Sequence, residues 1–218
     1  MSTLVLMKLL ESAPRRYEAA MRVITLGWVD RAGRRLVDLA LGEGGPRVLE
    51  LGCGTGAVTK RLLEAGANVD ALDQNPDMLD VARRELGGIP ASRLRFHECA
   101  AAEIDGWSED AYDAVVAGLL FSEMSSRERS YVFRQVGRVL RPGGVLVVAD
   151  EVLPRGRAAR FLHRALRLPL ALFTWLLTGS QTRPIDGLEA EMSAVGLGVV
   201  SVETSLIGSH AVVCARRP

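Results

Sequence analysis

The sequence feature that most constrains the fold is a short apolar run that leads directly into three glycines at alternate positions. Residues 47–51 have the pattern of a buried strand, and the glycines that follow are Gly52, Gly54 and Gly56. Because glycine lacks a Cβ, such a turn can bend sharply and approach a ligand closely. Asp73 ends the next apolar run, where a doubly wound α/β sheet places a carboxylate that accepts both ribose hydroxyls. The stretch therefore predicts a site for a nucleoside cofactor.

The spacing of the glycines decides which kind of nucleoside cofactor is expected. A dinucleotide fingerprint is G-x-G-x-x-G, whereas this chain has G-x-G-x-G preceded by Glu50. A carboxylate at that point repels a pyrophosphate and suits a cationic amine. The pattern resembles motif I of the class I S-adenosylmethionine-dependent methyltransferases. Segments 72–79, 112–116 and 138–148 resemble later motifs of that family in the same order, so the resemblance extends over about residues 47–150.

The resemblance implies a doubly wound α/β fold with helices on both faces of a seven-stranded, mostly parallel sheet in the order 3-2-1-4-5-7-6. One domain, 1–218, would contain an N-terminal helical cap (1–45), a cofactor-binding core (46–150) and a substrate-side helical insert with antiparallel C-terminal strands (151–218). The alternation of apolar runs with helical patterns supports this fold. Strands are predicted near 47–51, 68–72, 93–98, 112–117, 144–150, 198–204 and 210–215. Helices are predicted near 12–21, 28–41, 57–66, 76–86, 126–140, 157–178 and 185–195.

By the same resemblance, the cofactor is S-adenosylmethionine, bound at the carboxyl ends of the strands. Glu50 is expected to reach the methionine ammonium group, and Tyr17 either covers the methionine carboxylate or packs in the core. Cys53 is the small residue expected to fill a tight turn. The expected cofactor residues are Tyr17, Glu50, Gly52, Cys53, Gly54, Gly56, Asp73, Gln74, Met78, Ala100, Ala101, Gly118 and Leu119.

One position departs from the family pattern at the adenine end of the expected site. Ala100 stands where many family members have an aspartate that binds the adenine amino group. The departure leaves adenine recognition to the backbone and side chain around Ala101, or to Glu98 or Glu103.

Methyl transfer from a sulfonium requires an aligned and deprotonated nucleophile more than elaborate acid–base machinery. Candidates that can orient or deprotonate the acceptor follow the fourth and fifth strands: Glu123, Asp150 and Glu151, with Ser122 beside them. A carboxylate that ends a strand often only caps the next turn, and this alternative stays open for each of them. The three histidines are too far apart in the sequence to argue for a metal site.

The acceptor is predicted to be a small hydrophobic molecule. Segments 120–129 and 175–183 resemble those of corrinoid protein-associated methyltransferases, and the second also resembles methyltransferase-like proteins that methylate alkyl thiols. A lipophilic thiol is therefore the leading acceptor, with a lipid or quinone as the alternative. A non-catalytic accessory protein of a corrinoid system also stays open. A nicotinamide-dependent short-chain reductase is excluded, because it needs a Tyr-x-x-x-Lys pair and no tyrosine of this chain has a lysine four residues later.

The helical insert around residues 157–177 combines arginines at helical spacing with an apolar run that contains Phe173 and Trp175. It can be a peripheral membrane element, a lid over the acceptor or a helix packed on the sheet. Leu168–Leu177 is expected to border the acceptor pocket.

Charge and cysteine content bear on the expected partners and on the cellular location of the protein. The net charge is +1, from 27 basic and 26 acidic residues, which gives no reason to expect nucleic-acid binding. Three scattered cysteines are too few for a disulfide framework and favour a cytoplasmic protein. Residues 1–10 lack a basic segment and a cleavage site, so no signal peptide is expected, and no apolar run reaches the ~18 residues that span a bilayer.

Overall fold

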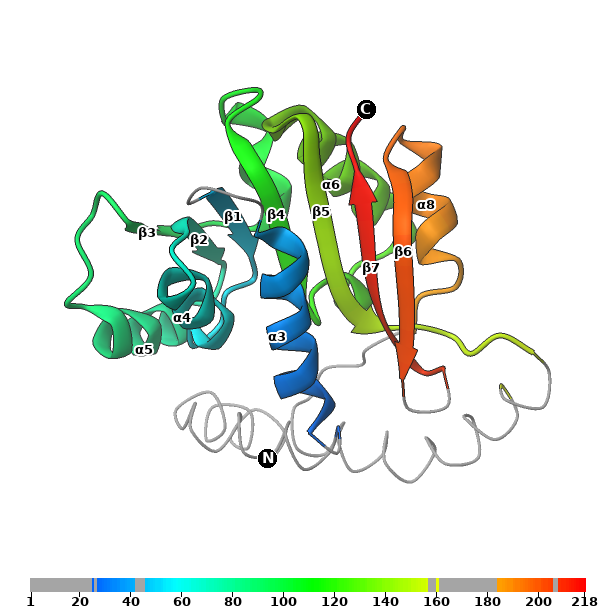
Figure 1. Ribbon diagram of the computed structural model, residues 1–218, viewed down its shortest axis with the longest axis horizontal. Coiled ribbons are helices and arrows are strands. Elements are labelled where there is room, and N and C mark those ends of the chain that lie inside the picture. Colours follow the sequence, from blue (N-terminus) through cyan, green and yellow to red (C-terminus); the bar gives the residue numbers. More distant parts are fainter. Residues whose placement is uncertain (1–24, 26, 42–45, 157–159, 161–183, 206–207) are drawn as a thin grey trace, which may run out of the picture.

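A seven-stranded sheet forms the centre of the structure (Figure 1). The computed structural model describes residues 25, 27–41, 46–156, 160, 184–205 and 208–218. The strands are β1 (Arg47–Leu51), β2 (Asn68–Asp73), β3 (Leu94–Glu98), β4 (Tyr112–Gly118), β5 (Leu140–Glu151), β6 (Gly198–Ser205) and β7 (His210–Arg216). Their order is β3-β2-β1-β4-β5-β7-β6; β1 to β5 are parallel, and β7 runs antiparallel to both β5 and β6. The predicted strand order and doubly wound fold are confirmed.

Helices cover both faces of the sheet. One face carries α3 (Trp28–Ala40), α4 (Ala57–Glu64) and α5 (Pro76–Leu86), and the other carries the 3-10 helix η1 (Ala101–Gly106), α6 (Ser126–Val139) and α8 (Leu188–Ala194). Figure 1 shows α3 in front of the sheet and α6 behind it. Side chains alternate between these layers: Val48 packs with the α3 layer and Leu49 with the α6 layer, and both are fully buried.

Local sequence signals set the ends of the helices. Asn75 accepts a hydrogen bond from the Asp77 backbone N–H and is followed by Pro76, which together begin α5. Ser125 and Glu128 form a capping box at the start of α6. The described helices therefore agree with the predicted ranges to within three residues at each end.

The start of β5 differs from the prediction. The Pro-Gly-Gly segment at 142–144 predicts a turn before residue 144, but β5 already begins at Leu140, which pairs with Tyr112. The register then shifts between Tyr112 and Ala114, and Gly143 has a φ of 79°. The glycine and proline are thus accommodated as an irregularity in a long strand rather than as a turn that precedes it.

Several predicted features lie outside the described residues. These are the helix predicted at 12–21 with Tyr17, and, apart from Arg160, the helix predicted at 157–178 with Phe173 and Trp175. The proposed division of the chain into cap, core and insert stays a prediction. In the described part of the chain, no helix is both long and apolar enough to cross a bilayer.

Candidate functional site

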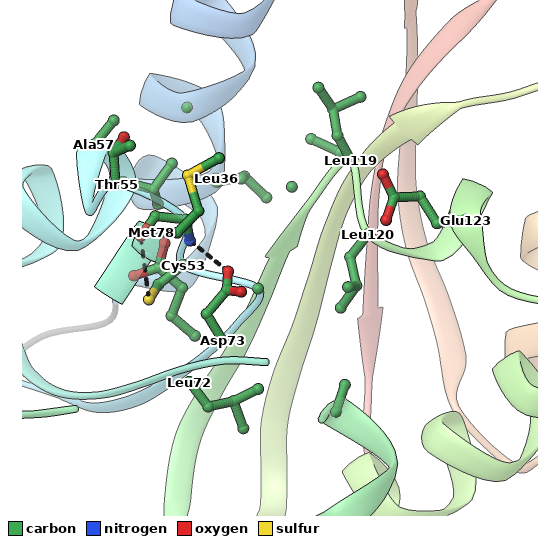
Figure 2. Close-up of a pocket in the computed structure, with 18 of the residues that line it drawn as sticks. Leu36, Cys53, Thr55, Ala57, Leu72, Asp73, Met78, Leu119, Leu120 and Glu123 are labelled. Atoms are coloured by element: carbon green, nitrogen blue, oxygen red, sulfur yellow. Dashed lines mark hydrogen bonds between the residues drawn. The ribbon is translucent and has the colours of Figure 1, made fainter. Parts of the chain in front are cut away.

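A pocket of about 650 Å³ opens at the carboxyl ends of β1, β2 and β4. In the strand order, β2 and β3 follow β1 on one side, and β4 and β5 lie on its other side. The pocket thus lies at the point where the strand order reverses, which is where open α/β sheets bind ligands. The pocket brings together predicted cofactor residues from segments far apart in the sequence (Figure 2). They are Glu50, Gly52, Cys53, Gly54, Asp73, Gln74, Met78, Ala100, Ala101, Gly118 and Leu119.

The glycines of the turn differ in the space around their Cβ positions. All have positive φ, at 70° for Gly52, 54° for Gly54 and 86° for Gly56. A Cβ at Gly54 would meet nothing within 4 Å, whereas one at Gly56 would lie 3.1 Å from a methyl carbon of Leu86. Gly56 is not among the pocket-lining residues. Gly54 therefore opens space for a ligand, and Gly56 lets α4 start close to α5.

Asp73 is held in place by two backbone N–H groups. Its Oδ2 accepts the Gly54 N–H at 2.7 Å, and its Oδ1 accepts the Asn75 N–H at 2.8 Å. Figure 2 shows the carboxylate directed into the pocket with the first of these bonds. Each carboxylate oxygen has more than one lone pair, so this geometry leaves acceptors for two ribose hydroxyls.

Glu50 is a buried carboxyl at the floor of the pocket. Its side chain is 3% exposed, and its Oε2 accepts a hydrogen bond of 2.6 Å from the Thr59 hydroxyl of α4. Burial raises the pKa of Glu50 to about 8, although the Thr59 bond opposes the shift. A bound ammonium group would favour the ionised form, so the site is suited to a cationic amine. Thr59 carried no recognisable signal in the sequence.

Cys53 lies in the pocket wall, and its chemistry is that of a buried thiol. It is 6% exposed, and burial raises its pKa far above the ordinary value, so it stays protonated. This environment agrees with a residue that fills the turn.

The adenine end of the expected site has an apolar lining around Ala100 and Ala101. Glu103 is engaged locally, because its Oε1 accepts the Ala100 N–H at 2.9 Å. Neither Glu98 nor Glu103 is among the described lining residues. Glu128 of α6, which the sequence analysis did not select, does line the pocket, and α6 packs on η1.

The acceptor side of the pocket is formed after β4. Leu119, Leu120 and Met124 line it together with Glu123, which comes from the short 3-10 helix η2 (Phe121–Glu123). Glu123 is exposed and lines the open pocket. Partial desolvation, assisted by the charges of Asp150 and Asp73, raises the pKa of Glu123. In Figure 2 the Glu123 carboxylate faces the same space as Asp73 from the opposite wall.

The other two predicted catalytic carboxylates are placed differently. Asp150 is fully buried, and it accepts hydrogen bonds from the backbone N–H groups of Phe121, Ser122 and Glu151. Neither Asp150 nor Glu151 is among the described pocket-lining residues. Asp150 thus has the capping role that the sequence left open, and only Glu123 of the three faces the pocket.

Helix α3 supplies a wall that sequence reasoning missed. Trp28, Gly33 and Leu36 line the pocket, as do Asp30 and Arg61, whose side chains form an ion pair at 3.1 Å between α3 and α4. A Cβ at Gly33 would lie 3.3 Å from the Arg61 guanidinium. Such a contact between two helices leaves no periodic trace in the sequence, and Gly33 within an amphipathic helix is its only hint.

The described residues fit S-adenosylmethionine. Glu50 offers a carboxyl for the ammonium group, Asp73 offers oriented acceptors for the ribose, and Gly54 leaves the space that a side chain would fill. The pocket volume suits one cofactor with an adjoining small acceptor. In the described part of the chain, no group of three or more histidine, cysteine or acidic side chains is placed to hold a metal ion.

Comparison with known proteins agrees with this site. Residues 48–144 match a family model described as a methyltransferase domain. The demethylmenaquinone methyltransferase of Thermus thermophilus is 36% identical over 158 residues, which cover 71% of this chain and 69% of that protein. The demethylmenaquinone methyltransferase of Mycobacterium sp. (strain KMS) is 33% identical over 158 residues, and the matched region covers 71% of this chain but only 63% of that protein.

A solved structure shows the same fold at low sequence identity. The S-adenosylmethionine-dependent methyltransferase from Mesorhizobium loti has a TM-score of 0.64 and 22% identity, over 85% of this chain and 98% of that chain. With the motif geometry and the sequence relatives, this likeness leads to one assignment. The chain belongs to the class I S-adenosylmethionine-dependent methyltransferases, and its cofactor is S-adenosylmethionine.

Proposed function

We propose that this methyltransferase methylates an apolar acceptor of the quinol type, with Glu123 as the group that accepts the acceptor's proton. The observation that carries the proposal is a carboxyl of raised pKa set in an apolar wall and facing the cofactor pocket. The names of the two relatives, both demethylmenaquinone methyltransferases, support a quinone-derived acceptor.

The chemistry of a quinol requires such a group. When bound, S-adenosylmethionine supplies an electrophilic methyl group on a sulfonium. Glu123 would take the proton of a ring hydroxyl, and the electron density left behind would move to the neighbouring ring carbon, which would bond to the methyl group as the bond between methyl and sulfur breaks. That carbon would then lose its hydrogen as a proton to solvent, and Glu123 would return its proton to the ring oxygen. A general base is most effective when its pKa lies near the working pH, and the raised pKa of Glu123 moves it in that direction. Leu119 and Leu120 would exclude water from the reacting atoms.

An alkyl thiol, the acceptor that the sequence pattern favours, is the second candidate. It would also fit an apolar wall, but the small fraction present as thiolate at neutral pH is already a strong nucleophile, so a thiol depends less on a base than a ring carbon does. The quinone in the names of both relatives supports the quinol as the first candidate.

The test offers the quinol and an alkyl thiol to the protein with radiolabelled S-adenosylmethionine under anaerobic, reducing conditions, and offers the oxidised quinone in a parallel assay without reductant. We expect label in the quinol of a demethylmenaquinone analogue and none in its oxidised form, because the oxidised ring carbon is electron-poor. Label in an alkyl thiol alone would replace the proposal by thiol methylation. No label in either acceptor would favour the accessory, non-catalytic role.

Glu123→Gln separates the base from the binding site. It should lower kcat with the quinol by about 10²-fold and leave affinity for S-adenosylhomocysteine unchanged within about twofold. Glu109→Gln is the matched control, since the Glu109 side chain is 72% exposed and is not among the described lining residues. A Glu123→Gln enzyme with wild-type kcat would remove Glu123 from the mechanism.

Two suggested associations stay predictions. Association with a corrinoid protein rests on the resemblance of segments 120–129 and 175–183. Contact with a membrane surface rests on residues 157–177, of which the structure describes only Arg160; its guanidinium donates to the Pro154 carbonyl and pairs with Asp186.

A further inference from the structure

The loop between β4 and α6, Leu119–Met124, carries Glu123 and forms the apolar acceptor wall. It begins in an unfavourable conformation: Leu119 has a φ of 55°, and its backbone N–H donates to the Ala149 carbonyl at 2.8 Å. A leucine in the left-handed region costs on the order of 1 kcal/mol, so surrounding interactions must impose this shape. Those interactions come from two buried side chains outside the described pocket lining, Asp150 and Arg129.

Asp150 holds the backbone N–H groups of the loop. Its Oδ2 accepts the Phe121 N–H at 2.7 Å and the Ser122 N–H at 3.2 Å, from directly below the turn that presents Glu123. The carboxyl is fully buried, and it has no solvent to compete for these bonds.

Arg129 binds backbone carbonyl groups of the same loop, whereas Asp150 binds its N–H groups. It lies on α6, is 7% exposed, and its Nη1 donates to the Met124 carbonyl at 2.7 Å and to the Phe121 carbonyl at 3.5 Å. Its Nε and Nη2 donate to the two carboxylate oxygens of Glu191 on α8, each at 2.7 Å. The planar guanidinium thus joins the loop to α8 in one fixed orientation.

We infer that Arg129 and Glu191, together with Asp150, are positioning residues that fix Glu123 and the acceptor wall against the cofactor pocket. Neither Arg129 nor Glu191 is among the described lining residues, so their effect on the reaction passes through the loop. A general base loses efficiency when its position varies by about 1 Å, which is the reason to clamp this loop from both sides. The role of Glu123 as base rests on the proposed function; the clamp itself does not.

The test removes the ion pair without leaving a buried charge. Replacing both partners, Arg129→Met/Glu191→Met, keeps the site apolar, a change that proteins often tolerate without loss of stability. The matched control is Arg35→Met/Glu203→Met, an equally bidentate pair between α3 and β6 with bonds of 2.6 to 3.0 Å, whose side chains are 40% and 46% exposed. Each protein is examined by urea unfolding, calorimetry with S-adenosylhomocysteine, quinol turnover, and carbon-13 NMR titration of the Glu123 carboxyl, assigned by comparison with Glu123→Gln.

We expect the Arg129/Glu191 variant to fold and to bind S-adenosylhomocysteine within about twofold of wild type, while its kcat falls at least about tenfold and the pKa of Glu123 returns toward the ordinary glutamate value. The Arg35/Glu203 control variant should keep the wild-type kcat and the wild-type pKa of Glu123. Wild-type kcat and wild-type Glu123 titration in the Arg129/Glu191 variant would overturn the inference, as would equal losses in the control. Should the wild type not methylate the quinol, the proposed function fails and the titration alone decides the inference.

Discussion

At the scale of single residues, Glu50 shows a conflict between binding and stability. Its folded-state pKa of about 8 lies above the ordinary glutamate value of 4.5. Below pH 4.5 the carboxyl is protonated in both the folded and unfolded states, so its ionisation does not lower the free energy of unfolding. Between pH 4.5 and 8 the unfolded state releases the proton and the folded state does not, so the free energy of unfolding falls as the pH rises.

Glu50→Gln should therefore remove this loss. At pH 8 the variant is expected to be more stable than wild type by a few kcal/mol, and at pH 4 the two should be nearly equal. Urea unfolding at both pH values measures the difference. A variant that loses stability equally at both pH values would show that the Thr59 hydrogen bond, rather than ionisation, dominates at this position.

The same glutamate should link cofactor binding to proton release. An ammonium group beside Glu50 favours its ionised form, so binding below pH 8 expels a proton and affinity for S-adenosylhomocysteine should rise from pH 6 to pH 8. Calorimetry in buffers of different ionisation enthalpy counts that proton. The Glu50→Gln variant should bind S-adenosylhomocysteine more weakly and release fewer protons on binding. Equal proton release in both proteins would place the titrating group elsewhere.

At the scale of elements, the sequence predicts best what is encoded locally. The helix starts predicted at residues 57, 76 and 126 agree with α4, α5 and α6, which the structure begins at the glycine turn, the Asn75 cap and the Ser125–Glu128 capping box. The strand order followed from the resemblance of successive motifs. Contacts between elements left no such marks. The Thr59–Glu50 bond and the pocket wall on α3 depend on which helices become neighbours, and those residues could not be assigned beforehand. Asp150 was predicted as a candidate catalytic residue, and its burial beneath the loop was not predictable from its place near the end of β5.

Gly56 allows a test of how α4 and α5 approach each other. Gly56→Ala introduces strain at a φ of 86° and a contact of 3.1 Å with Leu86, so it should lower the free energy of unfolding by roughly 2–3 kcal/mol. Gly66→Ala is the matched control, because Gly66 has a φ of 95° and open space around its Cβ position, and it should cost about 1 kcal/mol. The difference between the variants in urea unfolding measures the packing contribution. Equal losses would mean that Leu86 moves away without cost.

At the scale of the whole molecule, the two ends of the sheet have separate tasks. The carboxyl ends form the pocket, with its positive-φ turn and carboxyls of raised pKa. Toward the amino ends, Asp70 of β2 joins three other strands and is only 4% exposed. Hydrogen bonds reach its carboxylate from side chains on β1, β3 and β4: Arg47 at 3.1 Å, Arg95 at 2.8 Å, His97 at 3.1 Å and Tyr112 at 2.9 Å. Stability can therefore be altered at this end without contact with the site.

Asp70→Asn tests that separation. Burial alone would raise the pKa of Asp70, but the bonds from its four partners outweigh it and lower the pKa to about 2. A lowered pKa stabilises the fold above the unfolded value of 3.8, and this stabilisation is lost as the pH falls toward 2. At pH 7 the variant should be less stable in urea by about 2 kcal/mol, and the difference should shrink by about half at pH 3, while affinity for S-adenosylhomocysteine stays unchanged. Asp80→Asn is the control, because the Asp80 side chain is 66% exposed and pairs with Arg83 at the surface, so the variant should change stability by less than about 0.5 kcal/mol. A stability difference for Asp70→Asn that is the same at pH 7 and pH 3 would mean that the side-chain amide disrupts packing, and that the charge of Asp70 does not hold these four strands together.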